Sequence, residues 1–315
     1  MIMLQQMIIL FLIMLVGVVA RKKEIITDES SKKLSSIVVN ISNPCFIISS
    51  VLSDSVIEGK ELIITAIIAL ISYAVLIIIA GFLPIILKVQ LSKRGVYRAM
   101  IVFTNMGFMG FPIVAGIYGS EALLYGAVFM IPFNVLIYTY GVYVMAKDGD
   151  ELEEQSVDAV KVKRKFNLKL LINPGTVAVV IALVFYAMNI HMPYVFSKTI
   201  DMIGGLTAPL SMMVIGASFI GMDIKSVFTD IKLIMFSVIK LLIVPILFGF
   251  ILKLFITNQV MIGVTIIMIA TPVGSMVPML ASQYGGDVKE GTKGVAVTTI
   301  FSVITLSIVS VVLGL

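Results

Sequence analysis

Hydrophobic segments of about 20 residues recur along the chain, and short polar stretches separate them. A bilayer core of roughly 30 Å needs about 20 residues of α-helix, so each segment predicts one membrane-spanning helix. The segments lie at 2–20, 34–53, 62–87, 99–118, 122–146, 170–190, 200–220, 232–256, 260–283 and 293–314. The pattern therefore predicts an all-α integral membrane protein with ten transmembrane helices.

The fourth and ninth segments contain closely spaced glycines and prolines. These residues are Gly107, Gly110 and Pro112 in the fourth, and Pro272, Gly274 and Pro278 in the ninth. Proline lacks an N–H group and glycine tolerates non-helical backbone, so both helices are predicted to be broken. An unpaired backbone group in hydrocarbon costs several kcal/mol, so such breaks survive only where protein or a water-filled cavity covers them. We therefore expect helices four and nine to cross beside a cavity.

The two broken segments also match in position. Pro112 and Pro278 are 166 residues apart, and so are Gly119 and Gly285. This spacing divides the chain into a five-helix repeat at 1–146, a linker at 147–169 and a second five-helix repeat at 170–315. Because five is odd, the second repeat enters the membrane from the opposite side, which predicts an inverted repeat.

Charged residues orient the predicted helices. The segments 21–33, 88–98 and 147–169 contain five, four and six lysines and arginines, whereas 54–61 contains one and 119–121 none. By the positive-inside rule the basic segments are cytoplasmic, including the linker, and both termini are extracytoplasmic. We expect a multi-pass protein of the cell membrane.

Composition supports this assignment and excludes other classes. Hydrophobic residues make up 59% of the chain and charged residues 13%, and the mean hydropathy is +1.12. The net charge of +5 lies mostly in the orienting loops, so no nucleic-acid partner is expected. The single Cys45 allows neither a disulfide framework nor a cysteine metal cluster. No catalytic constellation or phosphate loop is present, so we expect neither an enzyme nor a bound cofactor.

Polar residues near the predicted breaks are candidates for substrate binding. Broken helices expose N-terminal N–H groups, which attract a carboxylate. The residues expected to add hydrogen bonds are Thr104, Asn105, Thr271 and Ser275, with Asn43 before Pro44 and, more weakly, Asn134. A simpler interpretation remains open, in which the glycines permit close packing, the prolines kink the helices, and Asn134 bonds to a neighbour.

Lys240 is the only charged residue deep within a predicted span. It lies eight residues beyond Lys232, or roughly 12 Å along a helix. An intramembrane cation is a functional candidate, so Lys240 is expected to face the cavity and balance an anion; alternatively, helix tilt brings it to an interface. The spans contain no carboxylate near their centres, which disfavours proton antiport. Neutral oxygens of Asn43, Asn105 and Thr271 could hold sodium, so coupling to Na⁺ or H⁺ stays open.

These residues resemble motifs of the auxin efflux carrier family, which includes plant auxin exporters and bacterial malate or malonate permease-like proteins. Asn105 precedes Pro112 by seven residues, and the segment Pro272-Val-Gly-Ser-Met-Val-Pro278 is similar to a second family motif with one extra residue. Asn173-Pro174 and Ile215-Gly-Ala-Ser218 add weaker matches.

The resemblance implies a fold similar to that of bile-acid/sodium symporters. A scaffold of helices 1, 2, 6 and 7 would hold a transport domain of helices 3, 4, 5, 8, 9 and 10, which moves organic anions by an elevator-type motion. Homodimers through the scaffold are implied as well. We therefore expect a secondary carrier of a small carboxylate. The alternatives are a sodium-coupled organic-anion symporter and, in another class, a membrane receptor or structural protein.

Overall fold

The computed structural model describes residues 2–52, 57–146, 173–220 and 229–315. Within these ranges the chain is helical and contains no strand, apart from one isolated antiparallel bridge between Thr104 and Val273. The prediction of an all-α protein is confirmed. The predicted linker at 147–169 lies outside the described residues.

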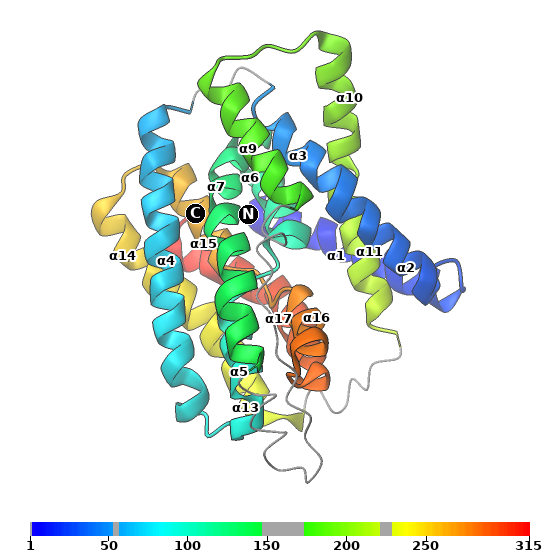
Figure 1. Cartoon of the computed structure of the whole chain (residues 1–315), viewed down its shortest axis with the longest axis vertical. Helices are drawn as coiled ribbons and strands as arrows, with labels where there is room; N and C mark the ends of the chain where they lie inside the picture. Colours follow the sequence, from blue (N-terminus) through cyan, green and yellow to red (C-terminus); the bar gives the residue numbers. More distant parts are fainter. Residues whose placement is uncertain (1, 53–56, 147–172, 221–228) are drawn as a thin grey trace.

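The helices follow one another with short connections (Figure 1). Those before residue 147 are α1 (Ile2–Lys22), α2 (Asp28–Ile37), α3 (Asn43–Ser49), α4 (Gly59–Ile86), α5 (Arg94–Val102), α6 (Phe111–Tyr118) and α7 (Leu123–Leu136). Those after residue 172 are α9 (Pro174–Ala187), α10 (Tyr194–Gly205), α11 (Thr207–Ser218), α13 (Ile231–Val238), α14 (Val244–Phe255), α15 (Gln259–Ala270), α16 (Met276–Tyr284) and α17 (Val288–Leu313). Wider π-helical turns occupy Val38–Ser42, Met106–Gly110, Ile137–Gly141 and Ile239–Ile243.

Six helical stretches among the described residues are long and apolar enough to cross a membrane, judged by length and composition. They are Leu4–Lys22, Gly59–Ile86, Ser120–Ala146, Tyr194–Ser218, Ile231–Phe255 and Val288–Leu313. The other four predicted segments also contain helix, but α2 is polar, α9 has only 14 residues, and the segments at 99–118 and 260–283 are interrupted. Length and composition of the described helices therefore identify six spans where the hydrophobic segments of the sequence predict ten.

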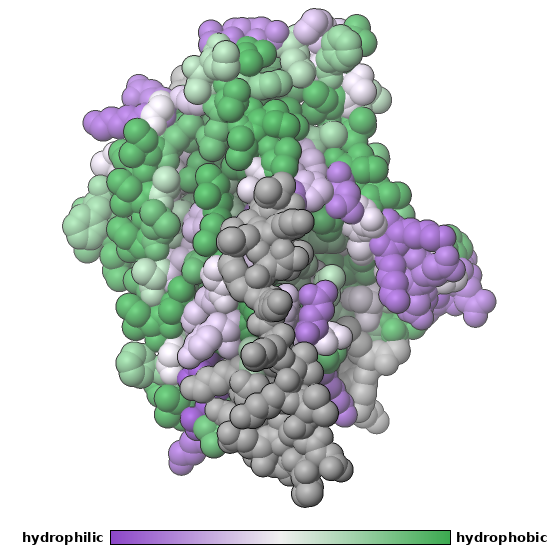
Figure 2. Space-filling view, viewed as in Figure 1, coloured by the Kyte–Doolittle hydropathy of each residue, from purple (hydrophilic) through white to green (hydrophobic). Residues whose placement is uncertain are grey.

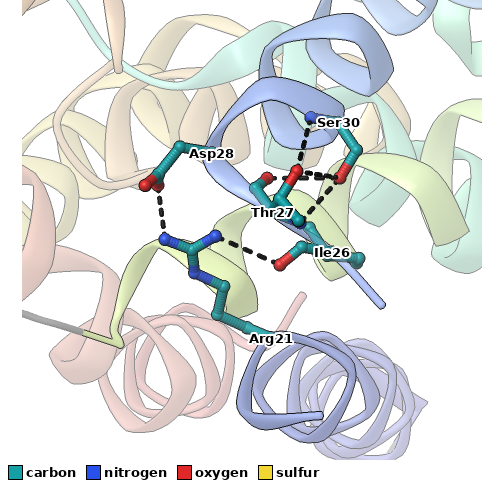
Figure 3. Close-up of polar contacts among 5 residues, drawn as sticks. All are labelled: Arg21, Ile26, Thr27, Asp28 and Ser30. Atoms are coloured by element: carbon teal, nitrogen blue, oxygen red, sulfur yellow. Dashed lines mark hydrogen bonds and ion pairs between the residues drawn. The ribbon is translucent and has the colours of Figure 1, made fainter. Parts of the chain in front are cut away.

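The second helical segment begins at Asp28, six residues before the hydrophobic window that predicted it. Thr27 caps this helix, because its hydroxyl accepts from the N–H of Ser30 while the Ser30 hydroxyl accepts from the N–H of Thr27 (Figure 3). Such a capping box satisfies N–H groups that have no intrahelical partner. Arg21 donates to Asp28 over 2.5 Å, and this hydrogen bond lowers the pKa of the Asp28 carboxyl below its ordinary value. The cap and the ion pair extend the helix into polar sequence.

Two glycines bring α1 into backbone contact with α11. A Cβ at Gly216 would lie 1.9 Å from the carbonyl oxygen of Met14, and a Cβ at Gly17 would lie 2.1 Å from that of Met213. Small residues allow membrane helices to approach this closely. α3 packs between α9 and α10, so α1, α3, α9, α10 and α11 form one contiguous group.

α2 contacts α11 and so belongs with the first group, whereas the remaining helices form a second packed group. α4, which runs along the left side of Figure 1, contacts α5 and α7, while α17 contacts α13, α14 and α16. α15 is buried over most of its length and contacts α4, α7 and α14. The centre of the protein therefore lies around α15 and the interrupted segment that contains α5 and α6.

Large apolar side chains are exposed along several helices. On α4, Ile63 and Phe82 are 65% and 63% exposed, and on α14 Leu254 is 78% exposed. Figure 2 shows hydrophobic surface over α4, whereas hydrophilic residues gather on α2 at the right. Apolar surface of this extent is typical of a protein whose neighbours are lipids.

Replacement of Gly216 by alanine should destabilise the protein. The new Cβ would overlap the Met14 carbonyl, and backbone cannot yield as a side-chain tip does. Overpacking of this kind costs about 1–3 kcal/mol, so the melting temperature in detergent should fall. Gly81→Ala is the matched control, because nothing lies within 4 Å of its Cβ position in α4. Equal melting temperatures for the two variants would contradict this account of the α1–α11 contact.

Candidate functional site

Two interruptions of the helices face each other at the centre of the protein. The first break (residues 103–105) separates α5 from the π-helical turn that begins at Met106, and the second break (residues 271–275) separates α15 from α16. The N–H of Asn105 donates to the carbonyl of Pro272 over 2.8 Å, and the N–H of Gly274 donates to that of Phe103 over 2.9 Å. Each break thus provides hydrogen-bond partners for the other.

Side chains satisfy further backbone groups of the second break. Lys240 donates to the Thr271 carbonyl over 2.9 Å, and the Val273 N–H donates to the hydroxyl of Thr298 on α17 over 3.0 Å. The Thr104 hydroxyl donates to the Met268 carbonyl near the end of α15 over 2.8 Å. The non-helical backbone of the second break is therefore accommodated inside the protein, because protein groups pair with its N–H and C=O groups.

Proline produces a second kind of unpaired carbonyl. Pro112 has no N–H to offer the carbonyl of Phe108 four residues earlier, and the helix widens into a π-helical turn just before it. The Ser211 hydroxyl on α11 donates to this Phe108 carbonyl over 2.9 Å. A serine from the first group of helices thereby compensates for a proline in the second.

A cavity of about 140 Å³ lies beside the paired breaks. It is well above the roughly 10–15 Å³ that one water needs. Its polar lining comes from five parts of the chain: the start of α3, the two breaks, α7 with the turn after it, and the residue before α9. The polar residues are Asn43, Thr104, Asn105, Asn134, Tyr138, Asn173 and Ser275. Among the described residues that line the cavity, none is an aspartate, glutamate, lysine, arginine or histidine.

Both helix starts that follow the breaks contribute to the lining. Met106, Gly107 and Phe108 begin one helix, and Ser275 and Met276 begin the other. The N–H groups in the first turn of a helix have no intrahelical partner, and this end carries partial positive charge. A cavity with neutral side chains and two such ends favours an anion over a cation.

Two buried side-chain atoms of the lining have no hydrogen-bond partner among the described residues. They are Oδ1 of Asn43 and Nδ2 of Asn134, and each side chain belongs to a residue only 7% exposed. Buried polar atoms in folded proteins are nearly always paired. These two atoms are exceptions, and each belongs to a residue that lines the cavity.

The structure brings seven of the predicted residues together around the cavity. They are Asn43, Thr104, Asn105, Gly107, Asn134, Gly274 and Ser275. Gly274 has an additional role, because a Cβ there would lie 3.0 Å from the carbonyl oxygen of Thr104 in the opposite break. The remaining predicted residues do not line the cavity: Pro44, Gly110, Pro112, Lys240, Thr271, Pro272 and Pro278.

The expectation that Lys240 faces the cavity is corrected by the structure. Its side chain is 2% exposed, and its ammonium lies against the carbonyl of Thr271 at the end of α15. The C-terminal end of a helix carries partial negative charge, which stabilises a cation there. Thr271 also lies outside the cavity, whereas Asn43 and Asn105 line it.

Tyr138 and Asn173 line the cavity without having been predicted as site residues. In the sequence, Asn173 stands out only as part of the Asn173-Pro174 motif. Asparagine before proline is typical of a helix start, and Asn173 caps α9 by accepting from the N–H of Thr176 over 3.0 Å. For Tyr138 no sequence signal distinguishes it from other aromatic residues of the spans.

A second, more open cavity of about 590 Å³ lies between the starts of α5, α13 and α17. Its charged groups mostly interact with protein partners: Lys93 pairs with Glu290 over 2.8 Å, and Asp230 caps α13. Burial lowers the pKa of the Lys93 ammonium, but the hydrogen bond and charge of Glu290 outweigh burial and raise it above its ordinary value. We interpret this cluster as an electrostatic contact between helix ends.

Comparison with known proteins agrees with the resemblance found in the sequence. A family model described as a membrane transport protein matches residues 2–310. The chain belongs to the auxin efflux carrier family. A search of curated proteins finds no match. Membership makes the chain a multi-pass membrane protein of a transporter family, and this family is not one of enzymes.

Replacement of Gly274 by alanine should disturb the paired breaks. The new Cβ would lie 3.0 Å from the Thr104 carbonyl oxygen and 3.3 Å from that of Phe103, and both belong to backbone. We expect a loss of about 1–3 kcal/mol, seen as a lower melting temperature in detergent. Gly107→Ala is the control, because its Cβ would approach only the side-chain nitrogen of Asn43, at 3.3 Å. A Gly274→Ala variant that melts no lower than Gly107→Ala would contradict the argument.

Proposed function

We propose that this member of the auxin efflux carrier family is a secondary transporter of small organic anions, such as malate, malonate or an auxin-like carboxylic acid. The observation that carries the proposal is the cavity beside the paired breaks, where two helix starts and neutral amides converge. The exposed N–H groups would bind a carboxylate, and the amides would orient the rest of the molecule.

The proposed transporter has ten membrane-spanning helices in a five-plus-five inverted repeat, with helices four and nine crossing at the breaks. Positive φ angles at two glycines in corresponding positions support the repeat. Gly119 after α6 has φ of +85° and Gly285 after α16 has φ of +86°. Their N–H groups donate to Ala115 and Ala281, which are also 166 residues apart. A positive φ favours glycine, so a glycine follows this helix in both repeats, although ψ differs, at 168° for Gly119 and 15° for Gly285.

We further propose that the two groups of packed helices are a scaffold and a transport domain. The scaffold would comprise spans 1, 2, 6 and 7, which correspond to α1, α2 with α3, α9, and α10 with α11. Their mutual packing, including the glycine contact of α1 with α11, supports a single rigid unit. Both breaks lie in the other group, so an elevator-type motion of that group would carry the helix starts across the membrane together.

The membrane orientation and the dimer proposed for the carrier follow from the positions of its charges and from its family. The basic segments would face the cytoplasm across the cell membrane, with both termini outside. Two copies would pair through their scaffolds. Sodium or proton coupling is tested by the transport assay below, since neither ion has an assigned site.

Replacement of Asn105 by alanine should reduce transport without unfolding the protein. The backbone bonds of Asn105 to Pro272, Met109 and Gly110 do not involve its side chain. Loss of one hydrogen bond to a charged ligand costs about 1.5–3 kcal/mol, so kcat/KM should fall roughly 10- to 150-fold. The measurement is accumulation of labelled malate or malonate in proteoliposomes, with and without a sodium or proton gradient.

Asn40→Ala provides the matched control, because Asn40 is exposed and, among the described residues, its side chain bonds only to nearby Ser36. It should transport as the wild type does. Wild-type transport by Asn105→Ala would remove this residue from the site. No accumulation of any organic acid by folded wild-type protein would contradict the proposed function and favour a receptor or structural role.

A further inference from the structure

The open cavity between the starts of α5, α13 and α17 contains more basic side chains than its ion pair uses. Its volume is about 590 Å³, and its charged lining residues are Lys93, Lys232, Lys293, Asp230 and Glu290. Three lysines against two acids leave the lining with an excess of one positive charge. The cavity is therefore suited to an anion only if the two acids are compensated within the protein.

Both acidic side chains are bound to donors of the protein. Glu290 is 3% exposed, and its two oxygens accept from Lys93 over 2.8 Å and from Tyr97 over 3.0 Å. Asp230 accepts from the N–H groups of Lys232 and Leu233 at the start of α13, an end that carries partial positive charge. Lys93 thus compensates Glu290, and the helix start compensates Asp230.

Two ammonium groups remain without a carboxylate partner among the described residues. Lys232 donates to the backbone carbonyl of Lys88 over 2.7 Å, and this neutral acceptor leaves its positive charge in place. Lys293 is half-buried on α17 and has neither a hydrogen bond nor an ion pair within the described part of the chain. An ammonium has three N–H donors, so both groups can bind an anionic oxygen.

Exposed apolar side chains lie beside these lysines. Ile231, the first residue of α13, lines the cavity and is 70% exposed. Ile86, the last residue of α4, is also 70% exposed and lies three residues before Val89 of the lining. The bond from Lys232 to the residue after next holds the end of α4 beside the start of α13 (Figure 1). Since both helices belong to stretches that can cross a membrane, the cavity lies where lipid-facing surface meets basic surface.

We propose that this cavity binds the phosphate of an anionic phospholipid such as phosphatidylglycerol. The ammonium groups of Lys232 and Lys293 contact the phosphate oxygens, and the acyl chains lie along Ile231 and Ile86. Basic pockets between membrane-spanning helices bind lipid headgroups in this way, and the charge of the lipid adds to the affinity. In the proposed orientation the lipid belongs to the cytoplasmic leaflet.

Free phosphate has the same charged group as the lipid but no acyl chains, so the two ligands can be distinguished. The melting temperature of the protein in detergent is measured with phosphatidylglycerol, phosphatidylcholine or inorganic phosphate, since a ligand of the folded state raises it. Phosphatidylglycerol should raise it most, and added salt should reduce the difference from phosphatidylcholine. Ile231→Ser should weaken the effect of phosphatidylglycerol and leave that of inorganic phosphate unchanged.

Replacement of Lys293 by glutamine should weaken the binding of phosphatidylglycerol about fivefold, which corresponds to ~1 kcal/mol for one lysine near an anionic lipid. Affinity is measured by native mass spectrometry during titration with the lipid. Lys289→Gln is the matched control, because Lys289 lies one turn earlier on α17, is exposed and does not line the cavity. It should bind as the wild type does. Lys293→Arg retains the charge and should bind within about twofold of the wild type. Melting temperatures without lipid check that each variant is folded.

Unchanged affinity in Lys293→Gln, or an equal loss in Lys289→Gln, would overturn the site, since general attraction between the protein and anionic lipid produces either result. A rise in melting temperature with inorganic phosphate that equals the rise with phosphatidylglycerol would overturn the choice of a lipid. None of these measurements uses transport, so their failure leaves the proposed function intact, and an absence of transport leaves this proposal intact.

Discussion

The hydrogen bonds between the two breaks are the constraint on which the rest of the structure depends. Asn105 bonds to Pro272 and Gly274 bonds to Phe103, so neither break is stable without the other. Within hydrocarbon the alternative is unpaired backbone, at several kcal/mol for each group. This requirement brings the fourth and ninth segments together, makes glycine necessary at position 274, and directs two helix starts toward one small volume.

Polar side chains in the spans are explained largely by the same requirement. Lys240 and Thr298 pair with backbone of the second break, and Ser211 pairs with the carbonyl that Pro112 leaves unused. A lysine without a carboxylate partner therefore needs no bound anion to account for it. In the proposed function, oriented peptide groups and amides would give the cavity its preference for anions.

The sequence alone predicts an interruption in each of the two segments, because glycine and proline have local effects on the backbone. Pro272 and Gly274 lie within the second break. The first break, at 103–105, contains neither residue and precedes Gly107. The direction of Lys240 could not be predicted, since its long side chain reaches several surroundings from one backbone position. Register was also unpredictable from the sequence: Thr104 lies opposite Val273. The cap formed by Asn173 is visible in its Asn-Pro motif, but its bond to Asn134 depends on the packing of α9 against α7.

The residues that line the cavity belong to both packed groups. In an elevator-type motion the substrate would therefore not keep all of its contacts. Asn105, Ser275 and both helix starts belong to the group proposed to move, whereas Asn43 and Asn173 belong to the proposed scaffold. In transit an anion would keep the peptide N–H groups and lose the scaffold amides. The bond from Asn173 to Asn134 spans the two groups, as does that from Ser211 to Phe108, so both must break during the motion. Both bonds form with the two groups aligned as in this structure, so they would favour this alignment over intermediate positions of the movement.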